Sequence, residues 1–375
     1  MKRIALVLAL VVAPVAVASA GATTARPLAG SWRLLPKAPI TPNDGGLASV
    51  WTGKQMIVFG RSGKQGPAGS TFHRLAVAAA YDPARNAWRR LTPPGPTSSF
   101  MDNHAVWTGK EALVLGQGTR LAYNPRTNHW RRLPSSPLLS IHDGYGIVAW
   151  TGRELIGWGG GCCGDAFSDG VAYNPATNRW RGLAPTPLAG DQDPLGAWTG
   201  RELVLFVSGV NPATGKPWPA RLARAAAYNP ATNTWRRIAP LPAPRGGASA
   251  VWDGREILVV GGAAGRTAAR AGFAYDPATN RWRRLAPMES GRIGAAAVWT
   301  GSRLLLWGGT TRPGGTAVPR HGLAYDPRTN GWSPLPQAPL VGRQQPTAVW
   351  TGRSLITWGG GTRTDGAAFT PARAS

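Results

Sequence analysis

The amino-acid sequence predicts an all-β protein: a seven-bladed β-propeller whose last blade is closed by the N-terminal outer strand. Three observations predict this fold: the composition, two motifs that recur along the chain, and the division of one motif between the two ends. The chain has 375 residues, among them 50 Gly, 34 Pro and 18 Trp. This mixture is typical of short strands joined by frequent turns, and it favours a fold built from internal repeats.

The first motif is a tryptophan that ends an apolar run and is followed by Thr-Gly or Asp-Gly. It occurs seven times at intervals of 43 to 56 residues, close to the roughly 50 residues of one propeller repeat. We expect it to mark the innermost strand of each blade. The tryptophans are Trp51, Trp107, Trp150, Trp198, Trp252, Trp299 and Trp350.

The second motif, Tyr-(Asp/Asn)-Pro-x-x-Asn-x-Trp, has six full copies, and its seventh copy is split between the two ends of the chain. The tryptophan half stands at Trp32, and the first half begins in the segment AAFTP at residues 367–371. We therefore expect the last blade to take its outer strand from residues 31–36 and its other three strands from the C-terminal part. The full copies begin at Tyr81, Tyr123, Tyr173, Tyr228, Tyr275 and Tyr325.

Each repeat reads as four strands, because apolar alternation is interrupted by turn-forming residues at fixed places. Glycines supply the positive φ of the tight turns, and the Tyr and Trp side chains are expected to fill the wedges between blades. In the fifth repeat the four strands are expected at residues 247–252, 257–260, 272–275 and 282–285.

The first twenty residues predict a cleaved secretory signal peptide. Lys2 and Arg3 precede an apolar run at residues 4–17, and Ala18-Ser19-Ala20 matches a signal peptidase site. The run is shorter than the roughly 20 residues that span a bilayer. We expect a secreted mature chain with no membrane span. Its segments are a signal peptide at 1–20, a linker at 21–30, the propeller at 31–371 and a short tail at 372–375.

The repeat resembles the kelch repeat of the galactose oxidase-like propeller superfamily, in its Gly-Gly after the second strand, its second motif and its period. The resemblance covers residues 31–371 and implies a fold, not one activity, because such propellers include oxidases, epimerases, binding proteins and scaffolds. The copper site of galactose oxidase needs a tyrosine cross-linked to a cysteine, a second tyrosine and two histidines. Cys162 and Cys163 are the only cysteines and are adjacent, so we expect no copper site, no other metal and no cofactor.

The loops on one face of the disc differ in every repeat, whereas the opposite face repeats the turn Thr-Gly-Arg-Glu with small changes. Variable loops on a rigid scaffold are where function is usually located. Seven residues before each first-motif tryptophan, where the chain enters the channel, stand Asp44, Phe100, Asp143, Asp191, Arg245, Arg292 and Arg343, with Asp102 nearby. Either the arginines brace neighbouring blades through backbone carbonyls, or they bind an anion while the aspartates accept hydrogen bonds from sugar hydroxyls.

Histidines and a tyrosine that do not belong to the repeat lie in the same region. His104, His142 and Asp143 are candidates for acid/base chemistry, and Tyr145 is a further ligand-binding candidate. The alternative is that these are ordinary polar loop residues. An enzyme that modifies sugars, similar to a sialic acid epimerase or a lyase, is therefore the second functional hypothesis.

Two other features fall in the variable loops. In an oxidising compartment Cys162 and Cys163 are expected to form a vicinal disulfide, the alternative being two free thiols. Trp218 lies between two prolines in the longest loop and is the one tryptophan that no repeat position explains. It either stacks on a ligand or packs on its own loop.

The formal net charge is +25, which favours polyanionic partners unless the arginines serve only solubility. No helix of groove size is expected, and export removes the usual target, so specific nucleic-acid binding is disfavoured. We expect a secreted, non-catalytic propeller that binds an extracellular carbohydrate or anionic polymer on its variable-loop face. A protein-interaction scaffold is the third hypothesis.

Overall fold

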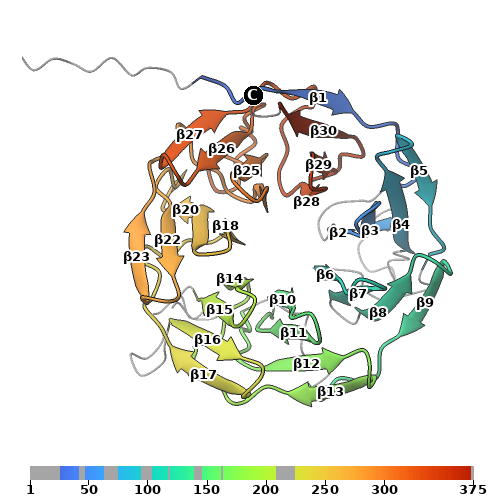
Figure 1. Cartoon of the computed structure of the whole chain (residues 1–375), viewed down its shortest axis with the longest axis vertical. Coiled ribbons are helices and arrows are strands. Elements are labelled where there is room, and N and C mark those ends of the chain that lie inside the picture. The colour runs from blue at the N-terminus through green and yellow to red at the C-terminus, as the bar shows by residue number, and fades with distance from the viewer. Residues whose placement is uncertain are drawn as a thin grey trace, which may run out of the picture.

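The chain folds as a ring of seven four-stranded antiparallel sheets, as predicted (Figure 1). The computed structural model describes residues 26–41, 47–62, 75–93, 104–116, 119–138, 146–161, 164–207 and 224–372. Within these residues it contains strands and turns but no helix. Successive blades follow one another around the ring, with the first strand of each repeat nearest the channel.

The strands of each blade are given from the channel outward. Blade 1 holds β2 (Ala48–Trp51), β3 (Met56–Ser62), β4 (Leu75–Asp82) and β5 (Ala87–Arg90). Blade 2 holds β6 (His104–Trp107), β7 (Ala112–Gly116), β8 (Thr119–Asn124) and β9 (His129–Arg132). Blade 3 holds β10 (Ile147–Trp150), β11 (Leu155–Trp158), β12 (Gly170–Asn174) and β13 (Arg179–Gly182). Blade 4 holds β14 (Leu195–Trp198), β15 (Leu203–Phe206), β16 (Ala225–Asn229) and β17 (Thr234–Arg237).

The remaining blades follow the same order. Blade 5 holds β18 (Ala248–Trp252), β19 (Ile257–Gly261), β22 (Phe273–Asp276) and β23 (Arg281–Arg284), with a small hairpin of β20 (Ala263–Ala264) and β21 (Thr267–Ala268). Blade 6 holds β24 (Ala296–Trp299), β25 (Leu304–Trp307), β26 (Leu323–Asp326) and β27 (Gly331–Pro334). Blade 7 holds β28 (Thr347–Trp350), β29 (Leu355–Trp358), β30 (Gly366–Pro371) and β1 (Gly30–Leu34).

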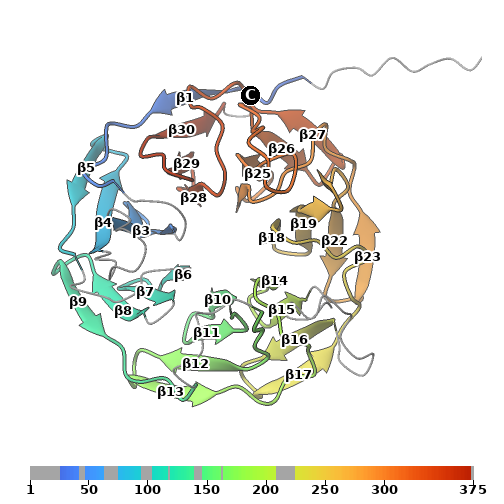
Figure 2. The same ribbon diagram turned by 180° about the vertical axis from the view of Figure 1, so that it is seen from behind.

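Blade 7 joins the two ends of the chain. Strand β1 is its outer strand and pairs antiparallel with β30, so that Trp32 lies opposite Phe369. Figure 2 shows β1 and β30 side by side at the outer rim. Closure by the N-terminal outer strand, as the split motif predicts, is confirmed.

The turns follow from the residues of the two motifs. In blade 3, Thr151 Oγ1 accepts hydrogen bonds from the backbone N–H of Arg153 and Glu154 at 3.2 and 2.8 Å. Gly152 between them has a φ of 92°, which a glycine adopts without strain. Asn178 has a φ of 53° and accepts the Tyr173 hydroxyl at 2.6 Å. Short polar side chains thus close both turns on this face.

Blade 5 shows how far the predicted strand limits agree with the structure. The inner strand begins at Ala248, one residue later than expected, because Gly247 turns the chain with a φ of 66°. The two outer strands are each displaced by one residue from the prediction. The β20–β21 hairpin was not predicted, since its two-residue strands carry too little pattern.

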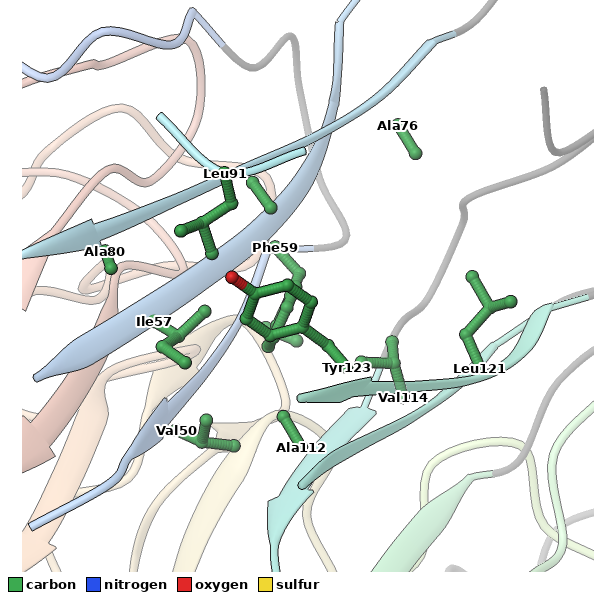
Figure 3. Packing of buried hydrophobic residues seen from close by; sticks show 12 residues of the cluster. Val50, Ile57, Phe59, Ala76, Ala80, Leu91, Ala112, Val114, Leu121 and Tyr123 are labelled. Atoms are coloured by element: carbon green, nitrogen blue, oxygen red, sulfur yellow. The ribbon is translucent and has the colours of Figure 1, made fainter. Parts of the chain in front are cut away.

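The hydrophobic core is divided into seven clusters, one between each pair of neighbouring blades. Figure 3 shows the cluster between blades 1 and 2, where Tyr123 of β8 faces Phe59 and Ile57 of β3. The ring centroids of Phe59 and Tyr123 are 6.5 Å apart. A single four-stranded sheet cannot cover both of its apolar faces, so each blade needs both neighbours.

Candidate functional site

The variable-loop face is formed by the loops that join the second to the third strand of a blade and the fourth strand to the next blade. The structure describes five of the predicted site residues: Asp191, Arg245, Arg292, Arg343 and His104. The other predicted residues lie outside the described part of the chain. They are Asp44, Asp102, His142, Asp143, Tyr145, Cys162, Cys163 and Trp218.

Three residues at the predicted channel-entry position connect neighbouring blades through their backbone. The carbonyl of Asp191 accepts the N–H of Gly160, and the carbonyl of Arg292 accepts the N–H of Gly262, at 2.9 and 2.7 Å. The carbonyl of Arg343 accepts the N–H of Gly309 at 3.0 Å. Each glycine follows the second strand of the preceding blade, so this position is a junction between blades.

The side chains of the three arginines are buried and turn toward their own blade. Arg245 Nη1 donates to the carbonyl of Gly261 at 3.3 Å and to that of Ala271. Its guanidinium also lies 5.0 Å from the centroid of the Phe273 ring. These partners stand at the two ends of one loop, so the guanidinium clamps that loop closed.

The other two arginines repeat this arrangement. Arg292 donates to Ser290 Oγ and, at 3.3 Å, to the carbonyl of His321. Arg343 binds both carboxylate oxygens of Asp365, at 2.8 and 3.1 Å. The sequence left open a brace between neighbouring blades, whereas these side chains hold loops of the arginine's own blade.

Burial shifts the pKa of two of these arginines. Loss of hydration lowers the pKa of Arg245 and lowers that of Arg292 to about 10, so Arg292 remains cationic at neutral pH. Burial alone would raise the pKa of Asp365, but the hydrogen bonds and charge of Arg343 outweigh it and hold this pKa below its usual range.

Asp191 and Arg245 come together at a hollow between blades 4 and 5. The hollow has a volume of about 170 Å³ and is also lined by Asp193, Phe206 and Val207. Asp191 Oδ1 accepts the backbone N–H of Asp193 at 2.9 Å, which fixes the turn that carries both carboxylates. The lining therefore combines two acidic residues, one arginine and apolar residues. Arg292 and Arg343 do not line it.

Glu289 and His321, which no sequence pattern indicated as functional residues, meet on blade 6. His321 Nε2 and Glu289 Oε1 are in direct hydrogen-bond contact, and the His321 carbonyl accepts Arg292. The sequence feature that could have indicated this pair is a histidine, His321, near the end of a variable loop. His104, which was singled out, begins strand β6 opposite Leu115 and is half-buried.

The described residues do not fit a copper site. Among them no three His, Cys, Asp or Glu side chains cluster closely enough to hold a metal ion. The six described tyrosines are all buried, and each donates its hydroxyl to the asparagine five residues later. The described part of the chain also contains no helix long and apolar enough to cross a membrane.

Seven four-stranded blades with two recurring motifs place the protein in the class of repeat β-propellers. More particularly, residues 244–289, which include the four strands of blade 5, match the family model of the Kelch motif.

A solved structure with the same fold is a copper-bound fungal alcohol oxidase of the AA5 family. The two chains are 14% identical with a TM-score of 0.69, and the match covers 91% of this chain and 76% of the oxidase. At this level of identity the likeness concerns the fold alone. No curated protein sequence matches the chain.

Proposed function

We propose that this protein is an exported, non-catalytic binding propeller that takes an extracellular carbohydrate or anionic polymer on its variable-loop face. The kelch propeller fold supports a binding or scaffold role in general. The predicted signal peptide supports export. The observation that carries the proposal is the hollow between blades 4 and 5, whose lining includes Asp191, Asp193, Arg245 and the apolar Phe206.

The lining of this hollow suits a polar ligand with an apolar face. Carboxylates accept hydrogen bonds from hydroxyl groups. The Arg245 guanidinium donates to the carbonyls of Gly261 and Ala271, so it contributes its positive charge to the attraction of an anionic substituent. Small-molecule sites typically combine a few such polar groups with apolar walls. The predicted ligand-binding Trp218 lies in the segment that connects Val207 to Arg224 in the sequence, and Val207 lines the hollow.

An array of neutral and acidic glycans identifies the ligand, and calorimetry then tests two variants. Trp218→Ala should weaken binding by about 1–3 kcal/mol, the contribution of one aromatic stacking contact. Asp193→Asn should also weaken binding, because the side chain lines the hollow. Both variants should melt at the wild-type temperature.

Asp165→Asn is the matched control, because it makes the same charge change on the same face outside the hollow. Unchanged affinity in both test variants would show that the ligand binds elsewhere. An unfolded Trp218→Ala protein would assign the indole to packing. Turnover of a bound sugar would favour the enzyme hypothesis instead.

A further inference from the structure

The turn face, opposite the variable loops, carries a row of ion pairs in blades 2 to 5. In each of these blades a glutamate at the end of the first turn binds the arginine that follows the outer-strand tryptophan. The Nη2–Oε2 distances are 2.6 to 2.7 Å. The pairs are Glu111–Arg131, Glu154–Arg181, Glu202–Arg236 and Glu256–Arg283.

The same arginines reach across to the next blade. Arg181 shows the full arrangement: Nε and Nη2 bind the two carboxylate oxygens of Glu154, while Nη1 donates to the Tyr228 hydroxyl at 2.8 Å. A carboxylate held by two parallel N–H donors is the strong, geometrically specific form of this contact. In each of these blades, therefore, a glutamate carboxylate binds the arginine that also contacts the next blade.

The glutamate is missing in three consecutive blades around the closure of the ring. The equivalent residues are Arg303 in blade 6, Ser354 in blade 7 and Gln55 in blade 1. In blade 7 the arginine is kept: Arg33 pairs with Ala368 in the register in which Arg181 pairs with Ala172.

Arg33 keeps its tyrosine but has no glutamate. Its Nη2 donates to the Tyr81 hydroxyl of blade 1 at 3.0 Å. Ser354 Oγ is bonded to Thr370 Oγ1 at 2.7 Å instead of to the arginine. Arg33 is thus an exposed guanidinium in a setting where four other blades supply a carboxylate.

A hollow of about 780 Å³ opens at this place between blades 7 and 1. It is lined by four basic side chains, Arg33, Lys54, Arg85 and Arg353, and by one carboxylate, Asp82, which is paired with Arg85 at 2.8 Å. Among the described residues no carboxylate forms a salt bridge with the other three.

A second hollow of about 890 Å³ lies between blades 6 and 7, and both are lined by Arg353 and Thr370. Arg303, which is paired with Asp326 at 2.9 Å, also lines this second hollow. We call these two hollows, which flank blade 7 and share two lining residues, the closure groove.

We propose that the closure groove binds an acidic peptide segment of a partner protein, with one glutamate or aspartate carboxylate placed on Arg33. The chain itself shows this contact in blades 2 to 5, where a glutamate side chain reaches the arginine equivalent to Arg33 from a neighbouring backbone segment. The groove carries a surplus of positive charge, so a segment with further acidic residues is complementary to it along Lys54 and Arg353. This site is independent of the variable-loop face and of its proposed ligand.

The test uses the full mature chain and a short fluorescein-labelled peptide of alternating glutamate and glycine, measured by fluorescence anisotropy at low ionic strength. Ser354→Glu gives blade 7 the residue that blades 2 to 5 have, so the chain's own carboxylate occupies Arg33. We expect about tenfold weaker binding or more, the loss of one charge-assisted contact. Arg353→Ala should weaken binding comparably, and added salt should weaken it in the wild type.

Two matched variants separate the groove from the overall charge. Ala176→Glu adds the same charge as Ser354→Glu on the turn of blade 3, and Arg153→Ala removes the arginine that corresponds to Arg353. Both should bind the peptide like the wild type, and a peptide with glutamine in place of glutamate should not bind.

Three results would overturn the proposal: a wild-type protein that does not bind the glutamate peptide, a Ser354→Glu variant that binds it unchanged, or equal losses in Arg153→Ala and Arg353→Ala. Binding of polygalacturonate without binding of the peptide would replace the acidic peptide by an acidic polysaccharide. Thermal melts of all variants show that the changes in affinity do not come from unfolding.

Discussion

At the scale of single residues, the asparagine of the second motif combines two properties in each copy. Its φ lies between 50 and 54° in all six full copies, a region that few residues other than glycine adopt routinely. Its Oδ1 accepts the hydroxyl of the buried tyrosine. In blade 4, Asn233 Oδ1 also accepts the backbone N–H of Ala184 in blade 3, at 3.0 Å. The asparagine therefore links a turn to the neighbouring blade.

Asn233→Ala should lower the free energy of unfolding by about 2–4 kcal/mol, because an alanine is strained at this φ and the Tyr228 hydroxyl loses its acceptor. Asn233→Gly should cost less, since glycine relieves the backbone strain but not the lost hydrogen bonds. Urea unfolding measures both variants. Equal stability of the two would show that the backbone contributes nothing.

At the scale of elements, the outer strand β1 holds the ring closed. It pairs with β30 over five residue pairs. Trp32 packs on Phe369 of blade 7 and on Trp307 of blade 6, with centroids 5.2 and 6.1 Å apart, and donates its indole N–H to the carbonyl of Pro336 at 2.9 Å. One short strand thus completes blade 7 and attaches it to blade 6.

Deletion of residues 21–36 should cause aggregation or a large fall in melting temperature, because it leaves β30 as an unpaired edge and uncovers Phe369. Deletion of residues 21–27 is the control, since it retains β1. Calorimetry and size-exclusion chromatography measure the outcome. A soluble 21–36 deletion with the wild-type melting temperature would mean that β1 does not contribute to closure.

At the scale of the whole molecule, the main feature is the excess of basic over acidic residues. With 42 basic and 17 acidic residues, much of the negative charge that the structure describes is used in ion pairs on the turn face. The hydrogen bonds from Arg236 lower the pKa of Glu202, and Arg343 holds that of Asp365 low, as described above. Such carboxylates stabilise the folded state when they are ionised.

Stability should therefore be constant near neutral pH and fall on acidification. The ordinary pKa values are 4.5 for Glu and 3.8 for Asp. Because the folded values are lower, the stabilisation is fully present above the ordinary values and is lost as the pH falls through the folded ones. Protonation also increases the self-repulsion of a cationic protein. Melting temperatures between pH 7 and pH 3 test this, and Glu202→Gln should show a smaller fall. A profile that is flat to pH 3 would contradict it.

The sequence by itself determined the fold of this protein. The strand order and the tight turns are encoded by short contiguous motifs that recur along the chain, so local turn chemistry and apolar alternation suffice to predict them. The split blade follows from the two halves of one motif at the chain ends. Counting from the first-motif tryptophans gave Asp191, Arg292 and Arg343 equivalent positions, and the structure shows that these positions are blade junctions. The β20–β21 hairpin and the exact strand limits could not be predicted in this way, because single residues such as Gly247 decide them.

Only the tertiary structure decided what the charged side chains contact. From the sequence alone, Arg245 could bind a ligand or brace the backbone. Folding brings the carbonyls of Gly261 and Ala271 to its guanidinium from two places in the chain. Arg33 and Ser354 stand near opposite ends of the sequence, so the missing carboxylate becomes visible only when β1 completes blade 7. A repeat determines its own strands and turns locally, whereas the partner of a long polar side chain depends on which distant segments the closed ring places around it.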